Sequence, residues 1–145
     1  IPLMISWPEK IAPRRDSTLA IAFADLYPSL LSLMGFKDEI PAEVQTFDLS
    51  ASILSPENTQ DVVQPYYYVV PENLTTGYRG LRTKKYTFVV HATNAQTDEW
   101  LLFDREQDPF QLNNIAPDQP ELIKQFSSRL KDWLKKTNDP FVNCL

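Results

Sequence analysis

The spacing of hydrophobic residues changes part-way along the chain. Before residue 55, apolar residues recur at helical spacing, as in the segment FADLYPSLLSLMGF over 23–36. After residue 61, apolar and polar positions alternate with a period of two, which is typical of strands. The turn-rich segment SPENTQD, 55–61, separates the two patterns. The sequence therefore predicts two structural parts, residues 1–57 and 58–145.

The first part is expected to contain one strand and two helices. IPLMISW, 1–7, is a short apolar run typical of a strand buried on both faces. In the helical segment quoted above, Asp25 is the predicted N-cap and Gly35 the predicted stop. A second, short helix is predicted near 48–54, with Asp48 as its cap.

The second part is expected to form a small antiparallel sheet of about four strands. The strands are predicted within VVQPYYYVV, GYRGLRT, YTFVVHA and DEWLLFD. Pro65 marks the first strand as an edge strand, because proline cannot donate to a sheet ladder. Lys84 and Lys85 are predicted to join the second strand to the third.

A C-terminal amphipathic helix is expected to lie across this sheet, which makes the fold class α+β. Asp118 and Glu121 have the spacing of a capping box at its start. Its apolar stripe consists of Leu122, Phe126, Leu130, Trp133 and Leu134.

Composition and charge exclude several classes of protein and site. The 145 residues carry a net charge of −5, which argues against nucleic-acid binding. No run of 18 apolar residues predicts a membrane span. His91 and Cys144 are single, so neither a disulfide framework nor a cysteine-based metal site is expected. The acidic residues within 98–108 lack the spacing and the glycine of a calcium-binding EF-hand loop. The residues alone predict no complete active site.

Five segments in order nevertheless resemble the sulfatases. They are IPLMISWPEKI, FADLYPSLLSLMGF, TFDLSASIL, YRGLRTKKYTFVV and EWLLFDREQDPFQLNNIA. In the third segment, Phe47 stands beside Asp48 where the family has a glycine. The resemblance implies that residues 1–57 are the C-terminal piece of a sulfatase α/β catalytic domain. It implies that residues 58–145 are the C-terminal α+β subdomain, which leans on that domain as its partner.

The resemblance also implies which catalytic parts lie elsewhere. Sulfatases use a formylglycine made from the cysteine or serine of a Cys-x-Pro-x-Arg motif, together with a divalent cation, usually calcium. Cys144 is followed by Leu145 and has no such context. Formylglycine and calcium are therefore expected upstream of Ile1 in a sulfuric ester hydrolase acting on sulfated glycans. The 145 residues alone are expected to be inactive, and the family implies an exported or lysosomal-type location.

The candidate substrate-binding residues are Tyr78, Arg79 and Arg82. Strand alternation places Arg79 and Leu81 on one face and Tyr78 and Arg82 on the other. Arg79 is expected to reach the rim of the sheet, where an arginine could bind a glycan sulfate or carboxylate in bidentate fashion. The alternative is a salt bridge between these arginines and the acidic residues at 98–108, or simple exposure to solvent.

Two other functions stay open at this point. The chain could be a non-catalytic carbohydrate- or protein-binding module, whose contact aromatics would be Tyr66, Tyr67, Tyr68 and Trp100. It could also come from a phosphoryl-transfer enzyme of the alkaline phosphatase superfamily, which shares the sulfatase scaffold.

Two further expectations concern a turn and the assembly. Asp104 and Asn114 are expected to bond turn backbone rather than substrate. The exposed apolar surface predicted within 1–36 is expected to make the 145-residue chain self-associate.

Overall fold

The computed structural model describes residues 3–13, 19–55 and 62–145. The chain divides into two compact units, Ile1–Val62 and Val63–Leu145. The boundary predicted between residues 57 and 58 falls among residues 56–61, which lie outside the described part of the chain.

The first unit contains both predicted helices. Its elements are η1 (Phe23–Asp25), α1 (Leu26–Leu33), η2 (Lys37–Glu39) and α2 (Ser50–Leu54). Asp25 directly precedes α1, as predicted, but its carboxylate does not cap that helix. It accepts hydrogen bonds from the Ala22 amide at 2.8 Å and the Phe47 amide at 3.0 Å. Gly35 follows α1 with a left-handed φ of +87°, which glycine adopts without strain.

Polar groups hold α2 close to α1. The Ser32 hydroxyl donates to Asp48 Oδ2 at 2.6 Å, and the Leu49 amide donates to Ser29 Oγ at 2.9 Å. Asp48 Oδ1 also accepts from the Ser50 amide at 3.0 Å, so Asp48 bonds the first residue of α2. Burial acts to raise the pKa of Asp48, but the hydrogen bonds from Ser32 and Ser50 outweigh it and lower that pKa.

The predicted strand at 1–7 is wrong for its described residues. Residues 3–7 form no strand, and the Met4 side chain is 93% exposed. A strand requires a neighbour to accept and donate its ladder hydrogen bonds. The described residues of the first unit include no strand, so this apolar run has no pairing partner among them. Residues 1 and 2 lie outside the described part.

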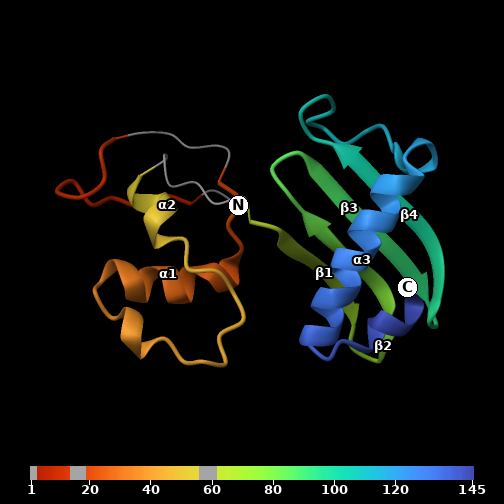
Figure 1. Ribbon diagram of the computed structural model, residues 1–145, viewed down its shortest axis with the longest axis horizontal. Coiled ribbons are helices and arrows are strands. Elements are labelled where there is room, and N and C mark those ends of the chain that lie inside the picture. Colours follow the sequence, from red (N-terminus) through yellow and green to blue (C-terminus); the bar gives the residue numbers. More distant parts are fainter. Residues whose placement is uncertain (1–2, 14–18, 56–61) are drawn as a thin grey trace. The chain divides into compact units, whose positions relative to one another are not determined.

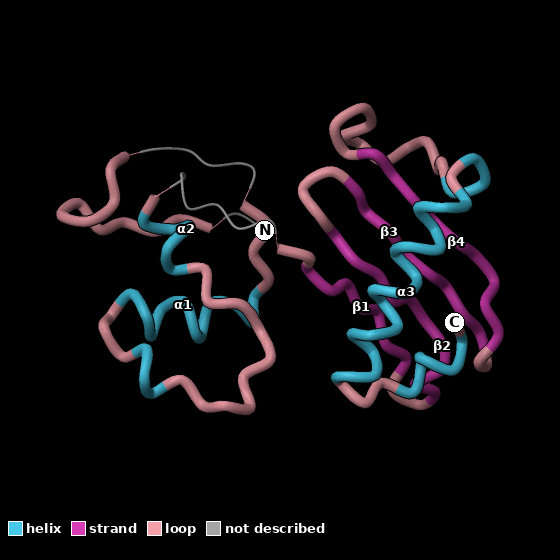
Figure 2. The backbone as a smooth tube through the Cα atoms, in the orientation of Figure 1, coloured by secondary structure: helices cyan, strands magenta, loops and turns pink. Residues whose placement is uncertain are grey.

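The second unit contains the four predicted strands in one antiparallel sheet. They are β1 (Gln64–Val70), β2 (Asn73–Arg82), β3 (Tyr86–Thr93) and β4 (Gln96–Asp104). The strands pair in chain order, β1-β2-β3-β4, as Figures 1 and 2 show. β1 is an edge strand, which is where its Pro65 can be tolerated.

The C-terminal helix α3 (Pro120–Lys136) crosses one face of this sheet (Figure 1). It lies between two short helices, η4 (Ala116–Asp118) and η5 (Pro140–Cys144). The predicted apolar stripe is confirmed, because its central residues are fully or almost fully buried against the strands. The core includes Leu81, Phe88, Val90, Leu102, Phe126, Leu130, Leu134 and Phe141.

The predicted capping box at the start of α3 is wrong. The helix begins at Pro120, its N-cap is Gln119, and no side chain caps it. Asp118 instead ends the preceding η4. Proline favours the first helical position and disfavours helical backbone in the residue before it, so Pro120 shifts the start beyond the capping box.

Candidate functional site

The predicted site residues are split between the two faces of the sheet. Arg79 and Leu81 are buried on the face that α3 covers, whereas Arg82 is exposed and Tyr78 half-buried on the other. The predicted alternation is therefore confirmed. We call the second face the outer face. Following the strand register, its larger side chains are Gln64, Tyr66, Tyr68, Tyr78, Arg82, His91, Glu99, Leu101 and Phe103.

Arg79 lies in the interior of the unit, not at its rim as predicted. Its side chain is 1% exposed, and its Nε donates to Asp139 Oδ2 at 2.7 Å. The predicted partners at 98–108 are thus replaced by Asp139, which directly precedes η5. A buried guanidinium needs such a carboxylate, because an unpaired charge away from water is very costly.

The rest of the Arg79 guanidinium is also engaged within this unit. Nη1 donates to the carbonyl oxygens of Tyr68 and Tyr78, both at 3.1 Å. Nη2 donates to the Leu74 carbonyl at 3.1 Å and lies 3.4 Å from Asp139 Oδ1. The guanidinium carbon also lies 4.7 Å from the centroid of the Phe141 ring. All three nitrogens therefore bond to the protein, which makes Arg79 a tie between the sheet and the C-terminal segment.

On the outer face, Tyr78 is the centre of an aromatic row. Its ring lies 4.4 Å from the His91 ring and meets the Tyr68 ring edge-on at 6.0 Å. His91 Nδ1 lies 3.2 Å from Asp98 Oδ2, so the lone histidine has a structural partner. Tyr68 remains 60% exposed, and the row therefore presents aromatic surface to whatever lies against this face.

Arg82 lies at the end of β2, four residues beyond Tyr78 on the same face. At the rise of an antiparallel strand, four residues span about 13 Å. Arg82 is exposed, so its guanidinium is accessible within this unit.

The four contact aromatics of the alternative binding module do not share one face. Tyr66 and Tyr68 belong to the outer face, but Tyr67 pairs with Arg79 and lies on the covered side. Burial raises the pKa of Tyr67, while hydrogen bonds from Trp133 and Thr137 act in the opposite direction. Trp100 packs against the core at 6.0 Å from the Phe88 ring. Tyr67 and Trp100 therefore stabilise the sheet and its helix.

The turn after β4 is held by Asp104 and Asn114, the two side chains predicted to bond its backbone. Asp104 Oδ1 accepts from the Glu106 amide at 3.0 Å and the Gln107 amide at 3.2 Å. Asn114 Oδ1 accepts from the Leu102 and Ala116 amides at 2.9 and 3.0 Å. Both side chains bond backbone, as expected, and they shape the segment that leads from β4 to η4.

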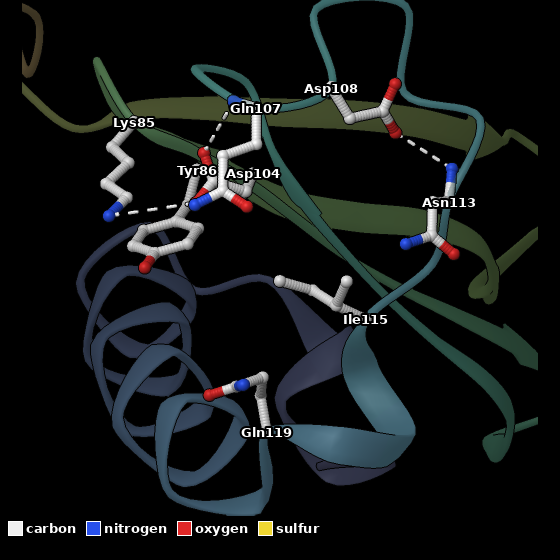
Figure 3. A pocket seen from close by; sticks show the side chains of 8 residues that line it. All are labelled: Lys85, Tyr86, Asp104, Gln107, Asp108, Asn113, Ile115 and Gln119. Carbon is white, nitrogen blue, oxygen red and sulfur yellow. Dashed lines mark hydrogen bonds and ion pairs between the residues drawn. The ribbon is translucent and has the colours of Figure 1, made fainter.

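This segment borders a polar hollow of about 300 Å³. Figure 3 shows Lys85, Tyr86 and Asp104 on one side of the hollow and Asp108 and Asn113 on the other. Gln119 lies at its lower edge, and Gln107 and Ile115 complete the wall. The Lys85 ammonium lies 3.7 Å from Asp104 Oδ2. Its pKa is raised by the Tyr86 side chain and by Asp104, so it stays charged at neutral pH.

Neither this hollow nor the partner of Arg79 could be predicted from local sequence patterns. The eight lining residues come from separate segments between 85 and 119, and no spacing connects them. Asp139 lies 60 residues beyond Arg79, and only the three-dimensional fold brings them together. The one local signal was the aspartate-proline turn at 108–109.

Within residues 3–13, 19–55 and 62–145, no three or more His, Cys, Asp or Glu side chains converge to hold a metal ion. Among the same residues, no helix has the length and apolar character needed to cross a membrane.

Comparison with known proteins gives one consistent family. Residues 1–139 match the family described as N-sulphoglucosamine sulphohydrolase, C-terminal. The chain is 33% identical to an endo-4-O-sulfatase of Bacteroides thetaiotaomicron, over 97% of this chain and 30% of that protein. It is 28% identical to an N-acetylglucosamine-6-O-sulfatase of the same organism, over 97% of this chain and 26% of that protein.

A solved structure agrees with these matches. A Bacteroides fragilis protein with a provisional sulfatase assignment is 57% identical and superimposes with a TM-score of 0.88, covering 96% of this chain. The match covers 30% of that protein, so this chain spans less than a third of each of these relatives. The chain belongs to the N-sulphoglucosamine sulphohydrolase C-terminal family, and it corresponds to the C-terminal portion of a sulfatase.

Proposed function

We propose that the protein containing this chain hydrolyses sulfuric esters of glycans. The observation that carries this proposal is the match of residues 1–139 to a sulfatase C-terminal family. The relatives named for endo-4-O-sulfatase and N-acetylglucosamine-6-O-sulfatase activity support a sulfated glycan as substrate. No observation favours the phosphoryl-transfer enzyme that the sequence left open.

The nucleophile and the cation of this reaction belong, in this proposal, to the part of the protein upstream of Ile1. A formylglycine there would supply the attacking oxygen, and calcium would balance the charge of the sulfate. Among the described residues no three or more His, Cys, Asp or Glu side chains converge as cation ligands. Cys144 is buried and is followed by Leu145, so it lacks the Cys-x-Pro-x-Arg context of the nucleophile. The role of this chain is therefore to support and border the reacting centre.

The outer face is the surface of the second unit that docks, in this proposal, against the upstream catalytic domain. Within the described residues of that unit, α3 and η5 cover only the opposite face. The outer face carries Tyr68 at 60% exposure and Tyr66 at 50%, which is apolar surface typical of a domain contact. The relatives are more than three times as long as this chain, and in this proposal the corresponding additional part of the parent protein lies against this face.

Tyr78 and Arg82 are the side chains through which this chain would touch substrate. Both belong to the outer face, whereas Arg79 is engaged in the interior and leaves the proposed contact set. An exposed arginine can bind a sulfate or carboxylate with two parallel hydrogen bonds. The Cα atoms of Tyr78 and Arg82 lie about 13 Å apart along the strand, a spacing that can accommodate an oligosaccharide.

The test is the release of inorganic sulfate by the full-length parent protein from defined oligosaccharides. One substrate carries a single sulfate at O4 of an N-acetylhexosamine, and its matched control carries that sulfate at O6. We expect the parent to desulfate at least one of the two and the 145-residue chain to desulfate neither. Absence of sulfate release by the parent from both substrates would contradict the proposed glycan substrate.

A further inference from the structure

The polar hollow beside the turn after β4 is a second feature of this unit, separate from the outer face. Asp104 is buried on the side of the sheet that α3 covers, and Ile115 packs against the same core. The hollow has a volume of about 300 Å³, at the lower end of the range for small-ligand pockets. A single sugar ring is a ligand of suitable size.

The walls of the hollow are held by hydrogen bonds that leave polar groups facing inward. The Asn113 amide donates to Asp108 Oδ2 at 2.8 Å, which closes the loop between these residues. Asp104 Oδ1 is occupied by two turn amides, but Asp104 Oδ2 has only the longer contact of 3.7 Å with Lys85. Each carboxylate therefore keeps acceptor capacity for a ligand.

The chemistry of the lining fits a ligand with many hydroxyl groups. Lys85 donates, the carboxylates accept, and the side-chain amides of Asn113 and Gln119 can do both. Tyr86 and Ile115 add apolar surface for the C–H groups of a sugar ring. One ammonium and two carboxylates give the hollow a formal charge of −1, which disfavours a sulfate or another anion.

The loop that closes the hollow also carries two large apolar side chains in the open. Phe110 is 82% exposed and Leu112 is 85% exposed, and both lie between Asp108 and Asn113. Carbohydrate rings present apolar faces beside their hydroxyl edges, so an exposed aromatic ring next to polar groups suits them. Phe110 and Leu112 do not line the hollow themselves, but they belong to the loop that borders it.

We propose that this hollow binds one unsulfated sugar residue, neutral or amino-substituted, of a glycan. The choice of a saccharide among hydroxyl-rich ligands rests on the proposed function. The hollow would hold a part of the polymer that carries no sulfate, whereas Arg82 on the outer face suits an anionic part. Lys85, Asp108, Asn113 and Gln119 supply the hydrogen bonds.

The experiment is a titration of the ¹⁵N-labelled 145-residue chain, followed by amide chemical shifts. The probes are glucosamine, N-acetylglucosamine and N-acetylglucosamine 6-sulfate, each at millimolar concentration. We expect saturable shifts for the two unsulfated sugars, confined to the signals of residues around the hollow, and weaker binding of the sulfated one. Shifts that are absent, scattered or strongest for the sulfated sugar would overturn the proposal.

Variants separate a binding role from a general effect on the fold. Lys85→Ala and Gln119→Ala remove donors from the hollow, and each is expected to weaken binding about tenfold, as for a lost hydrogen bond to a polar ligand. Gln125→Ala changes an exposed residue of α3 that does not line the hollow, and it should bind like the parent chain. Equal affinity in all three variants, with unchanged melting temperatures, would place the ligand elsewhere.

The result is independent of the sulfatase assay. Binding of an unsulfated sugar requires no hydrolysis, so a parent protein that releases no sulfate would leave a positive titration standing. Conversely, a negative titration would leave the sulfatase activity untouched. If an added second copy of the chain, rather than a sugar, shifts these signals, the hollow is a protein contact and the proposal is wrong.

Discussion

Arg79 on β2 and Asp139 at the start of η5 form a buried ion pair, with Nε and Oδ2 2.7 Å apart. Sixty residues separate the two partners in the sequence. The Asp139 carboxylate also accepts from the Phe141 amide at 2.9 Å, so one side chain both pairs with Arg79 and caps η5. The pair thus fastens the C-terminal segment of the chain to a central strand.

Replacing Arg79 by methionine is expected to destabilise the second unit by about 3–5 kcal/mol, the usual cost of leaving a buried charge unpaired. Denaturant unfolding measures this, followed by the fluorescence of Trp100 and Trp133 in a Trp7→Phe background. The matched control is Arg82→Met, which changes an exposed arginine on the same strand and should cost within about 0.5 kcal/mol. Equal stability of the two variants would show that Arg79 is not the tie described above.

Cys144 is expected to react slowly in the folded chain. Burial raises the pKa of its thiol. Arg79 lowers that pKa by less, and Asp139, with the smallest effect of the three, raises it. A raised pKa in the folded state favours the neutral thiol, so the corresponding stability is present below the unfolded pKa and is lost as the pH rises through the folded pKa. Labelling by a thiol reagent at pH 8 should therefore be much slower in the native chain than in denaturant. Equal rates would contradict the burial of this thiol.

Asp48 is expected to make the first unit sensitive to acid. Its folded pKa is lowered, so its contribution to stability is present above the unfolded pKa of a carboxylate and is lost as the pH falls through the folded value. The amide signals of α1 and α2 in the ¹⁵N-labelled chain can follow unfolding of this unit as a function of pH. In Asp48→Asn the loss of stability with acid should be shallower than in the parent chain, and an unchanged slope would contradict the assignment.

Gly80→Ala is expected to destabilise the sheet by about 1–3 kcal/mol or more, as in other overpacked interiors. A Cβ atom at this position would lie 2.2 Å from the Phe88 carbonyl oxygen of β3, a contact that backbone cannot relieve cheaply. Gly35→Ala is the comparison, because a Cβ there meets no atom within 4 Å and suffers only from its φ of +87°. Thermal unfolding of both variants checks the prediction. A Gly80→Ala variant as stable as the parent chain would mean that β2 and β3 lie farther apart at this position than described.

Local patterns predicted most of the second unit. Alternation located β1 to β4, and helical spacing identified the stripe of Phe126, Leu130 and Leu134, because each pattern follows from one element facing one core. Turn chemistry at Asp104 and Asn114 was also predictable, since those bonds span few residues. Local patterns were misleading for the segment at 1–7. Its composition is typical of a strand, but a strand forms only where a second strand lies beside it to share its ladder hydrogen bonds.

The candidate site was less predictable because its geometry is not local. Alternation gave the correct face of Arg79, yet its partner at position 139 depends on how the chain returns after α3. An arginine in a strand looks the same in sequence whether it meets solvent, substrate or a buried carboxylate. The hollow around Lys85 and Asp108 could not be predicted for the same reason. Its walls come from strand ends, a loop and a helix start, which are distant in sequence.

The substrate role of the outer face can be separated from its role in folding. In the full-length parent, Arg82→Ala is expected to lower kcat/KM for a sulfated oligosaccharide by about 1–3 kcal/mol of transition-state binding, with an unchanged melting temperature. Tyr78→Phe keeps the ring that lies against His91 and removes only the hydroxyl, so it isolates a hydrogen bond to the substrate. Full activity of both variants would show that the outer face does not contact the substrate and serves only as a contact between domains.

The central claim, that this chain is the C-terminal portion of a sulfuric ester hydrolase, is tested most directly by the ester preference of the full-length parent. The measurement compares kcat/KM for 4-nitrophenyl sulfate and 4-nitrophenyl phosphate under the same conditions, with the 145-residue chain as a control. A preference for the sulfate ester, and no turnover by the control, is the predicted result. A preference for the phosphate ester, or equal turnover by the 145 residues alone, would contradict it.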